Sequence, residues 1–184
     1  MSLTEYIIFS FNPRQRLVAA LLLFLGWLAF SSVLLYRFGF AHYGTFDDKQ
    51  LWRFDSAGIT LSQLSIPQVD GWQVVHVLDT TCGCTRLAKA HAGMFKELYQ
   101  LPAAQQLYRS AAELAAAGFV LPAVPAVLLF DRGKLVYAGP YASGPLCSTN
   151  NSFITSLLSG QTQLEGLWLN GESKACRCLV SPGT

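Results

Sequence analysis

Hydrophobic positions divide the chain into one long apolar run near its start and a longer mixed remainder. Residues 17–36 read LVAALLLFLGWLAFSSVLLY and carry no charged side chain. A helix of this length rises about 30 Å, the hydrocarbon thickness of a bilayer. The run is longer than the roughly 7–15 apolar residues of a signal peptide, and no small-residue cleavage site follows it. We therefore predict a transmembrane helix; a cleaved signal peptide and a buried core helix are the alternatives.

The apolar run organises the rest of the chain. We expect a short head at 1–16, a connector with the first domain element at 37–70, a folded domain at 71–160 and a cysteine-containing tail at 161–184. Arginines lie on both sides of the run, so the distribution of positive charge alone does not orient it in a membrane.

Beyond residue 70, strand-like and helix-like patterns alternate. Residues 72–79 read WQVVHVLD, a β-branched apolar run that predicts a buried strand. Residues 85–100 place apolar side chains at helical spacing and end before Pro102. Residues 105–109 fit either a strand or the start of the next helix.

The second half of the domain continues this alternation. Ser110 and Glu113 have the spacing of a capping box and predict a short helix. Residues 126–131 and 134–139 predict a hairpin, and 150–158 a last helix. The order indicates an α/β fold, a mixed sheet with flanking helices on both faces, preceded by the transmembrane helix.

Composition excludes some partners. Hydrophobic residues make up 52% of the chain and charged residues 13%, with a net charge of +2. No basic patch with interleaved aromatic residues is visible, so we expect no nucleic-acid partner.

Cysteines provide the candidate chemistry. Their positions are Cys82, Cys84, Cys147, Cys176 and Cys178, all after the apolar run and so in one compartment. Cysteine-rich domains suit oxidising compartments. We predict an N-terminus inside the cell and a domain on the extracytoplasmic, periplasmic-type side.

The Cys82-Gly83-Cys84 motif lies where the predicted strand gives way to a helix. A helix N-terminus stabilises a thiolate, which is the attacking form of cysteine. We assign Cys82 as the nucleophile and Cys84 as the resolving thiol. A bond between them requires a turn, which Gly83 permits, and would form a strained, oxidising disulfide.

These residues resemble the thioredoxin superfamily. A hydrophobic strand runs into a cysteine pair that opens a helix, and ELAAAGFVLPAVPAVLLFDRGKLVYAG is similar to the family's helix, Val-Pro loop and hairpin. The resemblance covers about residues 72–158. The motif differs from the family's Cys-x-x-Cys by one missing residue.

The resemblance implies a thioredoxin-like fold and particular roles for five residues. The Val124–Pro125 bond would be cis, and Val124, Pro125, Thr81 and Gly83 would line a substrate groove. His76 lies where the family often has a buried acid that moves protons for the resolving thiol. A core histidine hydrogen-bonded to backbone is the alternative for His76.

The other three cysteines are accessory or structural thiols. For Cys147 we favour a disulfide with Cys176 or Cys178 over a third redox thiol or an unpaired one. Cys176 and Cys178 either staple the tail to the domain or relay electrons as a dithiol.

Three functions follow. The leading hypothesis is an enzyme, a membrane-tethered thiol–disulfide oxidoreductase that exchanges disulfides with protein or peptide thiols through Cys82 and Cys84 and needs no cofactor beyond its dithiol. The second is a protein that binds or delivers copper, or zinc, through thiolates. The third is a non-catalytic scaffold whose disulfides staple it.

Overall fold

The computed structural model describes residues 12–53 and 58–181, and its contacts divide the chain into two units, Met1–Ala41 and His42–Thr184. Most of the predicted head, 1–11, lies outside the described residues.

The first unit contains the apolar helix α2 (Pro13–Leu35), followed by a π-helical turn, η1 (Tyr36–Phe40). Pro13 occupies the first turn, where a missing N–H leaves no hydrogen bond unmade. The mean hydropathy of α2 reaches 2.4, and none of the residues of α2 is buried in this unit. Among the described helices, α2 alone is long and apolar enough to cross a membrane.

The second unit contains the remaining elements. In chain order they are β1 (Tyr43–Thr45), η2 (Leu51–Arg53), β2 (Trp72–Val77), α3 (Thr85–Leu98), η3 (Ala103–Gln105), β3 (Gln106–Arg109), α4 (Ala111–Ala116), β4 (Ala123–Val124), β5 (Ala126–Asp131), β6 (Lys134–Gly139), η4 (Thr149–Asn151), α5 (Phe153–Leu158), β7 (Trp168–Leu169), β8 (Lys174–Cys176) and β9 (Cys178–Leu179).

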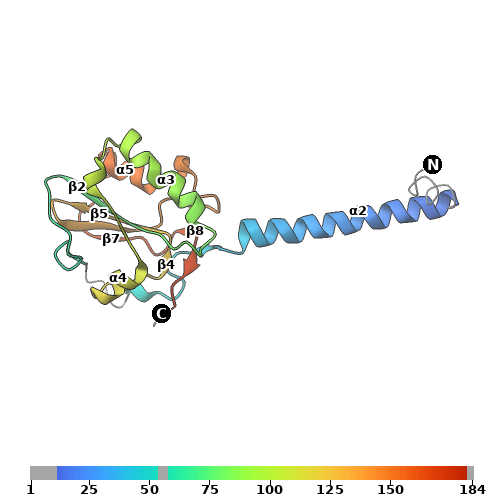
Figure 1. Ribbon diagram of the computed structural model, residues 1–184, viewed down its shortest axis with the longest axis horizontal. Helices are drawn as coiled ribbons and strands as arrows, with labels where there is room; N and C mark the ends of the chain where they lie inside the picture. Colours follow the sequence, from blue (N-terminus) through green and yellow to red (C-terminus); the bar gives the residue numbers. More distant parts are fainter. Residues whose placement is uncertain (1–11, 54–57, 182–184) are drawn as a thin grey trace. The chain divides into compact units, whose positions relative to one another are not determined.

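A five-stranded mixed sheet forms the centre of this unit, in the order β3-β2-β5-β6-β7. The β2/β3 and β6/β7 pairs are parallel, whereas β2/β5 and β5/β6 are antiparallel. Helices α3 and α5 cover one face and α4 lies on the other (Figure 1). Both faces of β2 and β5 are therefore buried, which explains their continuous apolar sequences. The predicted mixed sheet with helices on both faces is confirmed.

Local sequence signals determine where the elements begin. Ser110 Oγ accepts the N–H of Glu113 at 3.2 Å, and Glu113 Oε2 accepts the N–H of Ser110 at 2.7 Å, so the predicted capping box is formed. Residues 106–109 are a strand. The last helix begins later than predicted, at Phe153, because Ser152 Oγ caps it by accepting the N–H groups of Ile154 and Thr155.

The predicted tail is an integral part of the domain. Strand β7 extends the central sheet beside β6, β8 pairs with β1, and β9 pairs with β4. Residues 168–179 therefore pair with a strand from the start of the domain (β1), with one from its middle (β4) and with the central sheet (β6).

Candidate functional site

The turn between β2 and α3 positions Cys82 and Cys84. The N–H of Cys82 donates to the carbonyl of Asp79 at 3.1 Å, and the N–H of Thr85 donates to the carbonyl of Cys82 at 3.0 Å. Cys84 is the N-cap residue of α3, and its carbonyl accepts the N–H groups of Leu87 and Ala88. No acidic side chain occupies the first turn. Cys84 therefore begins the positive end of the helix, and Cys82 lies in the turn that leads into it.

Two disulfides in the described residues join this turn to the C-terminal segment, Cys82–Cys178 and Cys84–Cys176. The predicted Cys82–Cys84 bond is wrong, and the prediction of a strained disulfide within the motif falls with it. Alternate residues of an extended segment face the same side. Cys176 and Cys178 therefore both face the turn, where they bond Cys84 and Cys82, respectively.

The sulfurs form a compact cluster. Sγ atoms of Cys82, Cys84 and Cys178 all lie within 4.8 Å of one another, and Cys178 Sγ lies 3.8 Å from His42 Nδ1. Cys82 is 5% exposed and Cys84 1%, whereas Cys178 is only half-buried. Cys178 is therefore the more accessible residue of the Cys82–Cys178 disulfide.

Pro125 lies beside the cluster. The Val124–Pro125 peptide bond is cis, as predicted, and Cys82 Sγ lies 3.6 Å from the carbonyl oxygen of Val124. Val124 and Pro125 are buried, and β9 pairs with β4 so that Cys178 is opposite Val124. Thr81 and Gly83 are exposed in the adjacent turn. The chain's own tail thus covers the side where a groove was predicted.

His76 lies among aromatic side chains on the α3/α5 side of the sheet. Its Nδ1 is 2.7 Å from the Tyr141 hydroxyl, and its ring packs against Phe95 and Tyr108. Burial lowers the pKa of His76 to about 4. The cysteine turn packs on the opposite face, and no described contact joins His76 to a cysteine. His76 has the surroundings of a core histidine, with a tyrosine rather than backbone as its partner.

Cys147 is an unpaired, buried thiol, so the predicted disulfide with Cys176 or Cys178 is wrong. It packs in the cluster beneath α3 and α5, whereas the disulfides lie in the cluster on the other face of the sheet. Burial raises the pKa of Cys147 to about 11.

Arg177, between the two tail cysteines, is a site residue that the sequence patterns missed. Its N–H donates to the His42 carbonyl at 2.7 Å, its Nε donates to the Thr45 carbonyl, and its guanidinium is 3.9 Å from an Asp48 carboxylate oxygen. The available signal was alternation, because an extended C-R-C segment turns the arginine away from the side that its cysteines face.

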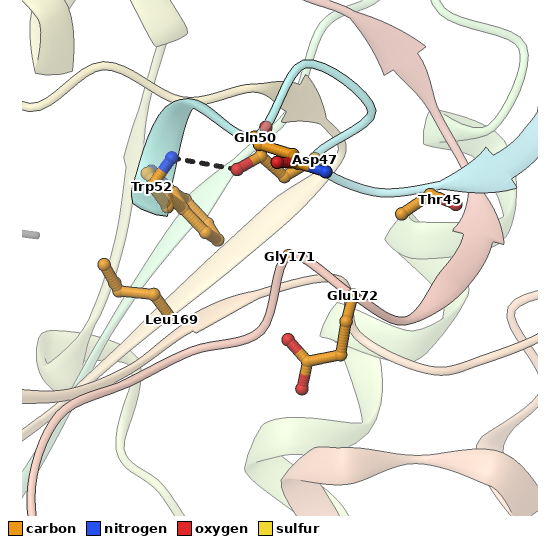
Figure 2. Close-up of a pocket in the computed structure, with 7 residues that line it drawn as sticks. All are labelled: Thr45, Asp47, Gln50, Trp52, Leu169, Gly171 and Glu172. Atoms are coloured by element: carbon orange, nitrogen blue, oxygen red, sulfur yellow. Dashed lines mark hydrogen bonds between the residues drawn. The ribbon is translucent and has the colours of Figure 1, made fainter. Parts of the chain in front are cut away.

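One cavity has no cysteine among the residues that line it. This cavity of about 380 Å³ is lined by Thr45, Asp47, Gln50, Trp52, Leu169, Gly171 and Glu172 (Figure 2). The Asp47 carboxylate accepts the N–H groups of Leu51 and Trp52 at 2.8 and 2.9 Å, so it caps a local turn. Glu172 lies 3.4 Å from the indole nitrogen of Trp168. The cysteine cluster remains the candidate site.

Fold and site together define a disulfide-linked α/β domain that follows an apolar helix. The chain belongs to the family described as "Domain of unknown function (DUF6436)", whose model matches residues 50–180. Comparison with curated proteins and with solved structures gave no match.

Proposed function

We propose that this protein is a membrane-tethered thiol–disulfide oxidoreductase that acts on protein or peptide thiols. The observation that carries the proposal is the Cys82–Cys178 disulfide, which lies at the start of α3 and beside Pro125. A strand leading into a cysteine turn and helix, and a prolyl bond leading into a hairpin, support a thioredoxin-like fold.

The reaction uses Cys82 and Cys178. A dithiol donor reduces their disulfide: its thiolate attacks Cys178 Sγ, the Cys82–Cys178 bond breaks, and Cys82 leaves as a thiolate. The donor's second thiolate then attacks the donor's first sulfur and Cys178 leaves, so two electrons pass to the protein, one proton goes to Cys178 and the other goes to solvent. The positive end of α3 stabilises the Cys82 thiolate.

The reduced site passes these electrons on. The Cys82 thiolate attacks a partner disulfide and forms a mixed disulfide, with one partner sulfur leaving as a thiolate. Cys178 then attacks Cys82 Sγ, which re-forms the resting disulfide and releases the second partner thiolate. The resolving role, expected for Cys84, falls to Cys178 because Cys84 is bonded to Cys176. The reverse sequence oxidises a partner dithiol.

The expected location of the domain, outside the cytoplasm, agrees with this chemistry. Disulfides persist in oxidising compartments, which supports a domain outside the cytoplasm, tethered by α2.

The test is a kinetic assay on the full chain in detergent. We expect the protein to catalyse reduction of a peptide disulfide by a dithiol and the Cys82→Ser variant to lose that activity. Cys147→Ala is the matched control, because Cys147 is unpaired and lies on the opposite face of the sheet. If Cys82→Ser and Cys178→Ser both match the parent, the enzyme is excluded and the stapled scaffold remains.

Capture of a soft metal ion is the second candidate. Three sulfurs within 4.8 Å of one another, with His42 beside Cys178, offer ligands suited to Cu(I) once both disulfides are reduced. Metal analysis of the reduced protein discriminates: stoichiometric copper supports this candidate, and its absence after Cu(I) loading contradicts it.

A further inference from the structure

We propose that β9 occupies a docking edge meant for a partner, an extended polypeptide segment whose cysteine takes the place of Cys178. The inference rests on the proposed function and names its substrate class and its regulation. In the resting protein the tail blocks the site, and reduction of Cys82–Cys178 opens it.

The first argument is the hydrogen bonding of β4. Among the described strands, β4 pairs with β9 alone, with Ala123 opposite Leu179 and Val124 opposite Cys178. The N–H of Val180 continues the pairing by donating to the carbonyl of Pro122 at 3.0 Å. Displacing the tail leaves this edge unpaired, and a second extended segment restores its hydrogen bonds by strand addition.

The second argument is register. Cys178 is opposite Val124, whose carbonyl oxygen lies 3.6 Å from Cys82 Sγ. A partner cysteine in that register therefore meets Cys82, whereas a shift of one residue turns it to the other side. The edge selects which sulfur reacts.

The third argument is the space next to the tail. A cavity of about 530 Å³ includes the tail in its lining, which consists of Leu78, Asp79, Thr80, residues 110–112, Val124, and Leu179, Val180 and Ser181 of the tail. Residues that follow the partner's cysteine would lie along this cavity, as the tail residues do.

The fourth argument is that the tail has a fixed part and a releasable part. Strand β8 pairs with β1 over three residues, Cys176 is bonded to Cys84, and Arg177 donates to the carbonyls of His42 and Thr45. By contrast, β9 is two residues long and Leu179 is exposed. Reduction of Cys82–Cys178 therefore frees the chain after Arg177 while Cys178 stays tethered close enough to resolve a mixed disulfide.

The experiment uses the full chain in detergent with Cys178→Ser, which leaves Cys82 as a free thiol and Cys84–Cys176 intact. The probe is a peptide of the tail sequence 175–181 with serine at the Cys176 position, its single cysteine activated as a disulfide with an aromatic thiol. Cys82 attacks the peptide sulfur and the released aromatic thiol is measured by absorbance. The control peptide carries proline at the Val180 position, which removes the N–H donor that would pair with Pro122.

We expect the tail-sequence peptide to react about tenfold faster than the proline peptide, the effect of roughly 1.4 kcal/mol in strand pairing. Both peptides should react equally with free glutathione. Adding Val180→Pro to the protein weakens its own tail and should raise the rate for the tail-sequence peptide further. Equal rates for the two peptides overturn the docking edge. Failure of the proposed function gives a different result: the parent would show no Cys82-dependent turnover in the kinetic assay, whichever peptide reacts faster here.

Discussion

At the scale of single residues, burial and bonding separate the five cysteines into two kinds. Four form the disulfides between the α3 turn and the tail, and Cys147 remains a thiol with a pKa raised to about 11 by burial. A thiolate is the reactive form, so little of Cys147 is reactive near neutral pH.

Alkylation tests this separation. We expect iodoacetamide at pH 8 to leave Cys147 unmodified in the native protein and to modify it after denaturation, since unfolding restores its exposure and ordinary pKa. Peptide mass spectrometry gives the modified fraction. Rapid labelling of Cys147 in the folded protein would contradict its placement.

His76 predicts a pH dependence of stability. Its pKa is lowered from 6.5 to about 4 in the folded state, so the unfolded state binds more protons between these values. The free energy of unfolding should therefore be fully retained above pH 6.5 and should fall by about 3 kcal/mol as pH drops towards 4. Urea unfolding at pH 7.5 and 4.5 measures the drop. It should shrink in His76→Gln; an equal drop in that variant would show that other groups cause it.

At the scale of elements, helix caps are the signals that can be tested singly. Ser110 accepts the N–H of Glu113 at the start of α4, so Ser110→Ala should lower the free energy of unfolding by about 1 kcal/mol. Ser159→Ala, after the end of α5, is the control and should change it little. Urea unfolding compares them, and equal losses would mean that the Ser110 cap is not the cause.

The sequence predicted elements well where the signal was local. The apolar run of β2, the turn between β5 and β6, and the Ser110 capping box each lie within a few residues. The disulfides were missed because their partners are 96 and 92 residues apart and are brought together by the β1/β8 and β4/β9 pairs. Short strands of two or three residues carry too little pattern to predict such pairing.

The candidate site likewise contains parts with a local sequence signal and parts that depend on distant residues. The cysteine turn at the start of α3 and the cis bond before Pro125 were predicted, the second through the resemblance. The partners of Cys178 and Arg177 could not be predicted, because alternation gives only the side that each faces and the partners depend on where the tail lies. The prediction for Cys147 failed because the sheet separates it from the tail cysteines.

At the scale of the whole molecule, the apolar helix and the disulfides together imply a location. If α2 anchors the domain outside the cytoplasm, the full chain should stay with membranes after high-salt washing. An alkaline phosphatase fused to its C-terminus should be active, because that enzyme folds only in an oxidising compartment. An inactive but intact fusion would place the domain in the cytoplasm.

The central claim is that Cys82–Cys178 is a redox-active disulfide, which opens and closes while the domain stays folded. Its most direct test is graded reduction of the native protein by a dithiol, followed by alkylation and disulfide mapping, with circular dichroism recorded at each step. We predict that Cys82–Cys178 opens first, while Cys84–Cys176 and the folded structure persist, because β9 is held by two residues whereas β8 is anchored to β1. If both disulfides open together, and only as the domain unfolds, they are structural staples and the account is contradicted.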